Sequence, residues 1–164
     1  MSVTQIDGSA MDAESRRSLQ RLSLLEGVGE PACEHLLASF GVAAFASGTV
    51  ILAEGNANDR LWVVLSGSLD VKLLEVGNRM CEVDLGELYE GDVFGEYSIF
   101  DGEPVSASVI ARRPSRIAWV SKSELDHFVE AFPADGRRLY DNLMRKLIAR
   151  LRAKNDEVDL RKTA

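Results

Sequence analysis

Two short segments of the sequence, residues 94–100 and 103–108, hold residue types that suit the binding of an anion. The first is Phe-Gly-Glu-Tyr-Ser-Ile-Phe and the second is Glu-Pro-Val-Ser-Ala-Ser. A phosphate needs N–H donors, which a glycine-bearing turn at the start of a short helix supplies together with the positive end of the helix dipole. The candidate donors are the backbone groups of Gly95, Glu96, Tyr97 and Ser98. The alternative is a structural turn that the fold requires whether or not a ligand binds.

Other chemistries find little support in the sequence. His35 and His127 are isolated in helix-like segments, which does not match the ligand spacing of a metal site. Cys33 and Cys81 are too few for a disulfide framework, and we interpret them as buried small hydrophobic residues. The sequence contains no P-loop, nucleophile elbow or strand-linked G-x-G-x-x-G turn. It therefore predicts a protein that is not an enzyme and that holds no metal.

The length and composition predict one globular domain. The chain has 164 residues, of which 46% are hydrophobic, and this is enough for one well-buried core. No apolar segment approaches the roughly 20 residues needed to cross a bilayer, and the first dozen residues show no leader pattern. We therefore expect a cytoplasmic protein.

The charge is unevenly distributed along the chain. The formal net charge is −7, but residues 136–164 hold nine Lys and Arg against four Asp and Glu, so this segment carries +5 and the remainder −12. A basic segment can bind nucleic acid or an acidic surface. Here the charges are interleaved with Leu143, Leu147 and Leu151 at helical spacing, which favours a solvated helix face.

The apolar pattern changes along the chain. Residues 1–14 are mostly small and polar, and we expect them to be disordered or frayed. Residues 15–40 predict two short helices with a turn between them. Short β-branched or alternating runs separated by glycines follow, and they indicate an antiparallel sandwich or barrel. The predicted strands are residues 49–53, 61–65, 69–76, 79–85, 105–111 and 116–120.

Alternation of apolar and acidic residues is clearest in the predicted strand 79–85. Cys81, Val83 and Leu85 alternate with Glu82 and Asp84. This pattern predicts that the first three side chains are buried and the two carboxylates face water.

Two helices are predicted after the strands. Ser121 to Glu124 has the form of a capping box, and the helix that it opens ends near Phe132, before Pro133. A longer helix follows from about residue 135, with apolar residues at alternating four- and three-residue steps, apart from Lys154 in the seam. These residues are Tyr140, Met144, Leu147, Leu151 and Val158. The stripe predicts either self-association or packing on the barrel.

The order of these motifs resembles that of the cyclic nucleotide-binding domain family, in its catabolite-activator-like form. The similar segments are residues 45–55, 61–68 and 91–96, and the resemblance covers roughly residues 20–155. It implies a mainly β fold: an eight-stranded antiparallel, jelly-roll-like β-roll with short flanking helices over residues 15–134. It also implies a C-terminal lid or dimerisation helix and tail over residues 135–164.

The same resemblance assigns roles to residues 94–108, which we call the cassette. In the family the residue matching Glu96 accepts a hydrogen bond from the ribose hydroxyl, and the residues matching Ser106 and Ala107 contact the phosphate. Val105 departs from the pattern, because it stands where the family has an arginine that reaches the exocyclic phosphate oxygens. A charge-assisted hydrogen bond contributes about 1.5–3 kcal/mol, and leaving a desolvated phosphate unpaired costs roughly 3–5 kcal/mol. About 1.4 kcal/mol is a tenfold change in affinity. Binding is therefore expected to fall from micromolar to roughly sub-millimolar or millimolar.

The sequence offers no clear replacement for this arginine. Arg112 and Arg113 lie further along the same predicted strand, about 23 Å or more away. Lys72 is predicted to face solvent and Arg79 to lie at a hairpin tip. Negative charge also surrounds the cassette and opposes an anionic ligand. The acidic residues are Asp92, Glu96, Asp101 and Glu103.

Three interpretations remain open. The first is a regulatory module with lost or weakened cyclic nucleotide binding, its pocket filled by apolar side chains, that acts through a protein partner or a homodimer. The second is a sensor of cyclic AMP, cyclic GMP or a related compound that signals through its C-terminal helix, where Arg138, Tyr140 or Asn142 could contact the base. The third is a pocket for a less anionic ligand. Sequence-specific DNA binding is not expected, because no recognition helix follows the long helix.

Overall fold

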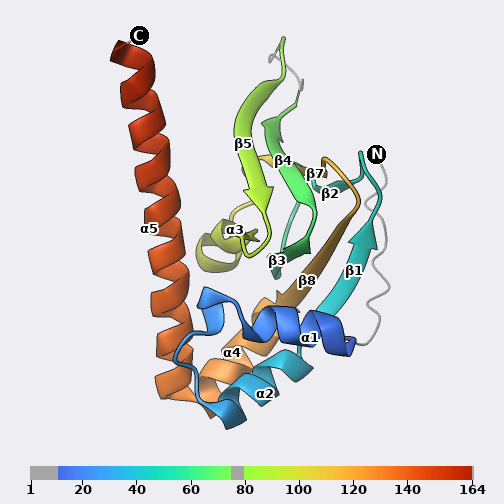
Figure 1. The fold of residues 1–164 in the computed structure, drawn as a ribbon, viewed down its shortest axis with the longest axis vertical. Helices are drawn as coiled ribbons and strands as arrows, with labels where there is room; N and C mark the ends of the chain where they lie inside the picture. Colours follow the sequence, from blue (N-terminus) through green and yellow to red (C-terminus); the bar gives the residue numbers. More distant parts are fainter. Residues whose placement is uncertain (1–10, 75–79, 164) are drawn as a thin grey trace.

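The computed structural model describes residues 11–74 and 80–163. Its strands form two four-stranded sheets in the orders β1-β8-β3-β6 and β2-β7-β4-β5, with antiparallel pairing throughout. The strands are β1 (Gly41–Phe45), β2 (Val50–Leu52), β3 (Arg60–Ser66), β4 (Ser68–Leu73), β5 (Val83–Tyr89), β6 (Val93–Phe94), β7 (Ser108–Ala111) and β8 (Ser115–Ser121). Figure 1 shows helices gathered at one end of this roll and a long helix along its side. The prediction of an eight-stranded antiparallel β-roll with flanking helices is confirmed.

Strand β3 explains how the roll and the helices share one sheet. Its run of consecutive apolar residues is buried on both faces, as expected for a central strand. Leu61 and Val63 belong to the core formed with the helices, whereas Trp62 and Val64 belong to the core between the two sheets. The molecule therefore has two apolar layers, and the second of them forms the interior of the β-roll.

The N-terminal helices are α1 (Ala13–Gln20), a 3-10 turn η1 (Ser23–Leu25) and α2 (Glu30–Ala38). Helix α1 begins before residue 15, where the helical region was predicted to start, because the Asp12 side chain caps it by accepting a hydrogen bond from the Ser15 amide at 2.7 Å. The predicted disorder of residues 1–10 falls outside the described residues.

The strand predicted over residues 79–85 lies further along the chain, at Val83–Tyr89. The predicted first residue, 79, lies outside the described residues. The predicted burial alternation is wrong, because Cys81 is exposed and Val83 and Leu85 are 39% and 37% exposed. Strand β5 is an edge strand paired only with β4. Its later residue Leu88 belongs to the core between the sheets, whereas Val83 and Leu85 do not. Cys33 is half-buried. The prediction that both cysteines are buried is therefore wrong.

The strands lead into α3 (Glu96–Asp101), which follows β6, and then into α4 (Lys122–Ala131) and α5 (Pro133–Thr163) after β8. The capping box at Ser121 and Glu124 is present as predicted. Helix α5 starts at Pro133 rather than near residue 135, because proline is well suited to the first turn of a helix.

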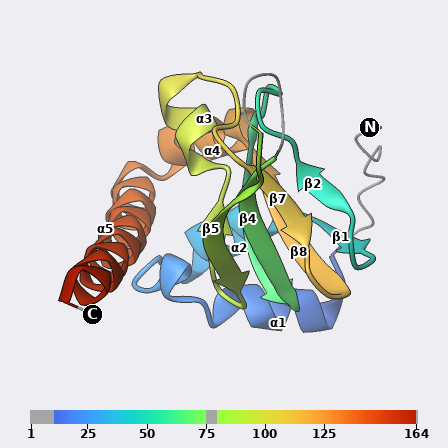
Figure 2. The same ribbon diagram turned by 90° about the horizontal axis from the view of Figure 1, so that it is seen from above.

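Helix α5 packs on α4 and η1 near its start and then runs past α3 and β5 (Figure 1). Seen from above, it lies on the β5 side of the roll, away from β1 and β2 (Figure 2). At 31 residues it is the longest described helix, but neither it nor any other helix in the described parts of the chain is apolar enough to cross a membrane.

Candidate ligand-binding site

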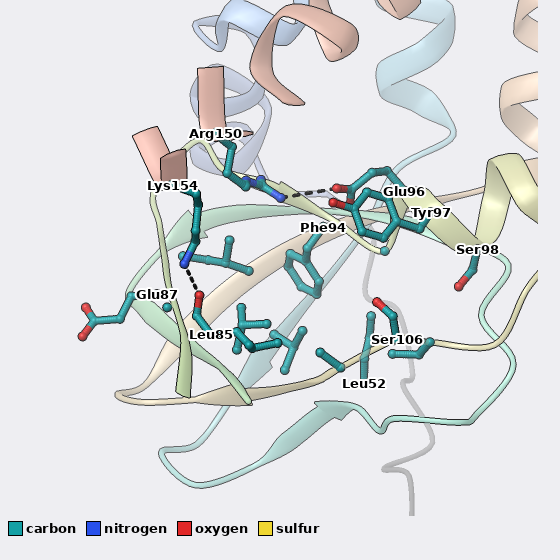
Figure 3. Close-up of a pocket in the computed structure, with 17 residues that line it drawn as sticks. Leu52, Leu85, Glu87, Phe94, Glu96, Tyr97, Ser98, Ser106, Arg150 and Lys154 are labelled. Carbon is teal, nitrogen blue, oxygen red and sulfur yellow. Dashed lines mark hydrogen bonds and ion pairs between the residues drawn. The ribbon is translucent and has the colours of Figure 1, made fainter. Parts of the chain in front are cut away.

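A cavity of about 250 Å³ opens in the β-roll on the side that faces α5. Its walls are mainly apolar side chains from strands β2, β4, β5, β6 and β7, and its rim includes the cassette and α5 (Figure 3). The lining residues are Leu52, Val71, Leu85, Gly86, Glu87, Leu88, Phe94, Gly95, Glu96, Tyr97, Ser98, Val105, Ser106, Ala107, Val109, Arg150 and Lys154.

All seven residues predicted from the sequence as candidate ligand contacts lie around this one cavity. They are Gly95, Glu96, Tyr97, Ser98, Val105, Ser106 and Ala107. Residues 95–98 come from the turn into α3, and residues 105–107 come from the segment before β7. The fold thus brings the two halves of the cassette together, and their contact with a ligand stays a prediction.

Gly95 occupies a position that requires glycine. Its φ of +76° is left-handed, and a Cβ there would lie 2.7 Å from Cδ1 of Trp62 and 2.9 Å from the carbonyl oxygen of Arg60. The Asn58 amide donates to the carbonyl oxygen of Gly95 at 3.0 Å, and its oxygen accepts from Nε1 of Trp62 at 3.0 Å. Asn58, which the sequence did not single out, therefore fixes the turn that opens α3.

Val105 holds the second half of the cassette in place through its backbone. Its amide donates to the carbonyl oxygen of Asn56 at 2.9 Å, and its carbonyl oxygen accepts from the Gly55 amide at 2.8 Å. The side chain is 8% exposed and packs in the core between the sheets. Residue 105 therefore offers an apolar surface to the cavity, where an arginine would offer charge.

Glu96 is buried and faces α5. It is 3% exposed, and its Oε1 lies 3.3 Å from Nη1 of Arg150 (Figure 3). Burial raises the pKa of the Glu96 carboxyl, and its own backbone amide and the Arg150 charge lower it by less. Desolvation therefore outweighs the ion pair at this carboxylate, and the Glu96 pKa lies above its ordinary value.

Arg150 and Lys154 reach from α5 to the roll one helical turn apart. Nη2 of Arg150 donates to the carbonyl oxygen of Val93, and Nζ of Lys154 donates to the carbonyl oxygen of Leu85. Neither residue was among the predicted site residues, because the basic charges of this segment were interpreted as a solvated helix face.

The spacing of α5 residues carried a signal for these two contacts. Leu139 and Leu143 are buried against the helical core and Leu147 packs beside them, and Arg150 and Lys154 continue the same three- and four-residue steps. Where a buried helix face changes from leucine to cations, the helix passes from an apolar core to a polar opening.

The residues predicted for the lid lie elsewhere on α5. Asn142 is buried and donates to the carbonyl oxygens of Leu24 and Glu26 at 3.0 and 2.8 Å. Tyr140 stacks edge-on against Phe100, with ring centroids 5.6 Å apart. Arg138 packs near Gly27. None of these three is among the residues that line the cavity.

The residues of the predicted dimerisation stripe do not all lie on one exposed face of α5. Leu147 packs against the helical core and Lys154 faces the cavity, whereas Met144 and Leu151 are 56% and 62% exposed. The exposed apolar face therefore runs through Met144, Ile148, Leu151 and Val158 rather than through Tyr140 and Leu147.

The other basic residues considered from the sequence do not line the cavity where the structure describes them. Lys72 pairs with Glu82, with 2.6 Å between Nζ and Oε1, and Arg112 pairs with Glu87. Arg79 lies outside the described residues. In the described part of the chain, no group of three or more His, Cys, Asp or Glu side chains could hold a metal ion.

Residues 42–132, more than half of the chain, match the family described as cyclic nucleotide-binding domain. The chain therefore belongs to the cyclic nucleotide-binding domain family.

Three similar proteins illustrate the match. The chain is 29% identical over 140 residues to a CRP-like cAMP-activated global transcriptional regulator of Mycobacterium tuberculosis, covering 85% of this chain and 60% of the relative. A crystal structure of a cyclic nucleotide-binding domain from Methylobacillus flagellatus has a TM-score of 0.81 at 22% identity, covering 94% of this chain and 89% of that one. The Thermus thermophilus catabolite activator protein has a TM-score of 0.67 at 25% identity, covering 85% and 63%. The chain thus spans about 60% of the length of the curated regulator that it matches.

Proposed function

We propose that this protein is a non-enzymatic regulatory module in which a weakly bound cyclic nucleotide in the β-roll controls a protein contact made by α5. The observation that carries the proposal is that one helix, α5, both lines the cavity and has an exposed apolar face. Arg150 and Lys154 of α5 line the cavity, and Ile148 and Leu151 of the same helix segment are 44% and 62% exposed.

The open cavity supports ligand binding over a pocket filled by its own side chains. Val105 and its apolar neighbours line the space of about 250 Å³ without closing it. The turn at Gly95 and the hydroxyls of Ser98 and Ser106 remain at its edge. Because residue 105 brings no charge, affinity below that of a domain with the arginine is expected.

The exposed face of α5 supports contact with a second copy of the chain. Met144, Ile148, Leu151 and Val158 are all at least 44% exposed. With Asn155 they follow steps of four, three, four and three residues, which place Ile148 and Asn155 at a positions and the other three at d positions of a heptad. A single asparagine at an a position is a device that sets register and oligomer state in two-stranded parallel coiled coils.

Ligand binding and pairing with the second copy are linked if the ligand has different affinities for two positions of α5. A ligand that binds more tightly when Arg150 and Lys154 are seated shifts the helix toward that position. Seating the helix also fixes the orientation of its exposed apolar face. This orientation either favours or opposes pairing with the second copy of the chain.

The test is calorimetric titration of the purified protein with cyclic AMP, cyclic GMP and cyclic dinucleotides, with the molar mass of the same samples measured by light scattering. Binding at or below millimolar concentration, with a mass distribution that changes on binding, supports the proposal. A stable dimer that binds none of these compounds at millimolar concentration contradicts it and favours a ligand-independent interaction module.

A further inference from the structure

The cavity of the β-roll takes its positive charge from α5, the helix that lines one side of it. Resting on the proposed function, we propose that Arg150 and Lys154 form a cationic clamp that binds the anionic group of the ligand, a cyclic phosphate, at the α5 end of the cavity. The clamp supplies the positive charge for the phosphate that the apolar side chain of Val105 does not.

The inventory of charge around the cavity leads to this assignment. Among the 17 described lining residues only four are charged, the cations Arg150 and Lys154 and the carboxylates Glu87 and Glu96. Glu87 pairs with Arg112, and Figure 3 shows its carboxylate directed away from the cavity. The charges that face the space are therefore Glu96 and two cations, and both cations belong to α5.

Each cation has donors to offer a ligand. A guanidinium carries five N–H groups and an ammonium carries three. The described contacts of Arg150 are Nη1 to Glu96 and Nη2 to the carbonyl oxygen of Val93. Lys154 makes its described contact with the carbonyl oxygen of Leu85. An anion between the two side chains can thus accept further hydrogen bonds without either cation leaving the rim.

The backbone of β5 leaves room for Lys154. The pairing of β4 with β5 shifts register between Val71 and Lys72, which oppose Gly86 and Asp84, so Leu85 is the extra residue of a bulge. Gly86 has a φ of +126°, and a Cβ there would lie 2.7 Å from Nζ of Lys154. The bulge and the glycine together allow the ammonium group to lie beside the Leu85 carbonyl at the cavity edge.

The position of the charge has a consequence for signalling. An arginine at residue 105 would lie within the β-roll and would attract an anion wherever α5 stood. Charges on α5 attract the ligand only when the helix is seated, so binding of the anion and seating of the helix stabilise each other.

The experiment uses two double variants. The first carries both Arg150→Gln and Lys154→Gln, and the charge-matched control carries both Arg137→Gln and Arg145→Gln, at two exposed positions of the same helix. Calorimetry measures the affinity of the full chain and both variants for cyclic AMP and for adenosine, which lacks the phosphate. Circular dichroism and the thermal midpoint establish that each variant is folded.

The clamp predicts that the Arg150 and Lys154 substitutions weaken cyclic AMP binding by about tenfold or more, while adenosine binding changes by less than about twofold. It also predicts that cyclic AMP affinity falls less steeply with salt in this variant than in the control, a readout that does not need the nucleoside. Unchanged cyclic AMP affinity and salt slope, or equal losses for both compounds, would overturn the clamp.

The two proposals fail in different ways. If the native protein and the control bind no cyclic nucleotide, the proposed function fails and the clamp fails with it. If the native protein binds cyclic AMP and the double variant binds it equally well, the clamp alone fails and the regulatory module stands.

Discussion

Nη1 of Arg150 lies 3.3 Å from Oε1 of Glu96, joining the C-terminal helix to the cassette across 54 residues of sequence. The carboxylate is buried and the guanidinium is partly exposed, so the pair lies at the boundary between the cavity and solvent. A ligand that reaches the cassette meets this pair, and a movement of α5 away from the roll breaks it. In the proposed regulatory module, this pair links occupation of the cavity to the position of the helix.

Glu96→Gln tests how burial and the ion pair balance at this carboxylate. Because the pKa of Glu96 is raised above its ordinary value of 4.5, the native state keeps this proton at pH values where the unfolded chain has lost it. The free energy of unfolding contributed by Glu96 therefore falls as pH rises from about 4.5 through the raised pKa. We expect the native protein to lose stability relative to the Gln variant over this interval and the difference to level off above it.

Urea denaturation of both proteins at a series of pH values measures this difference, because the remaining carboxylates cancel in the comparison. Parallel curves would show that Glu96 titrates alike in the folded and unfolded chains. A difference that grows in favour of the native protein as pH rises would show instead that Arg150 and the backbone amide outweigh burial.

Val105→Arg is expected to tighten cyclic nucleotide binding. The side chain of residue 105 lines the cavity, and a charge-assisted hydrogen bond to phosphate contributes about 1.5–3 kcal/mol, or about a tenfold to hundredfold gain in affinity. Calorimetry with cyclic AMP measures the gain. Val105→Gln, which adds a polar side chain without charge, is the control, and an equal gain in both variants would exclude charge as the cause.

Gly95→Ala is expected to destabilise the fold more than Gly102→Ala. The two glycines have almost the same φ, +76° and +74°, but only Gly95 has neighbours within 4 Å of an added Cβ. The left-handed backbone costs about 1–2 kcal/mol in either case, and the contact with Trp62 and the Arg60 carbonyl adds roughly 1–3 kcal/mol at Gly95. Chemical denaturation of the two variants measures both costs. Equal losses would mean that the turn can shift away from Trp62.

Leu151→Glu is expected to weaken self-association through α5. Leu151 is 62% exposed and lies at a d position of the exposed face, where a carboxylate from each chain would be brought together in a parallel pair. Sedimentation equilibrium measures the dimer dissociation constant, for which we expect an increase of about tenfold or more. Ala149→Glu makes the same charge change at an exposed residue outside the stripe, and an equal effect there would argue against the proposed seam.

The fold was largely predictable because its strands follow simple patterns. The buried run of β3 and the capping box at Ser121 were located from the sequence. Strand β6 has only two residues, too few to show a period, and it was missed. Strand β5 was misplaced because an edge strand leaves side chains such as Val83 and Leu85 partly exposed, so alternation there does not report burial.

The site was predictable only where its residues are neighbours in sequence. The cassette is two local segments, and its candidate residues all lie around the cavity. Arg150 and Lys154 reach the same cavity from a helix more than 40 residues later. Their role therefore depends on the direction that α5 takes after Phe132 and on which of its faces lies against the roll. Charge composition alone cannot distinguish a cation on a solvated face from one directed into a pocket.

The central claim is that occupation of the β-roll and the state of α5 are coupled. The most direct test is the dimer dissociation constant, measured by sedimentation equilibrium with and without saturating cyclic AMP, with ligand binding to the same sample verified by calorimetry. We predict that the ligand changes this constant by about fivefold or more. Because each dimer holds two ligand sites, dimerisation then changes the affinity of each site by the square root of that factor, about twofold or more. A dimer constant that is unchanged when the cavity is occupied would contradict the account.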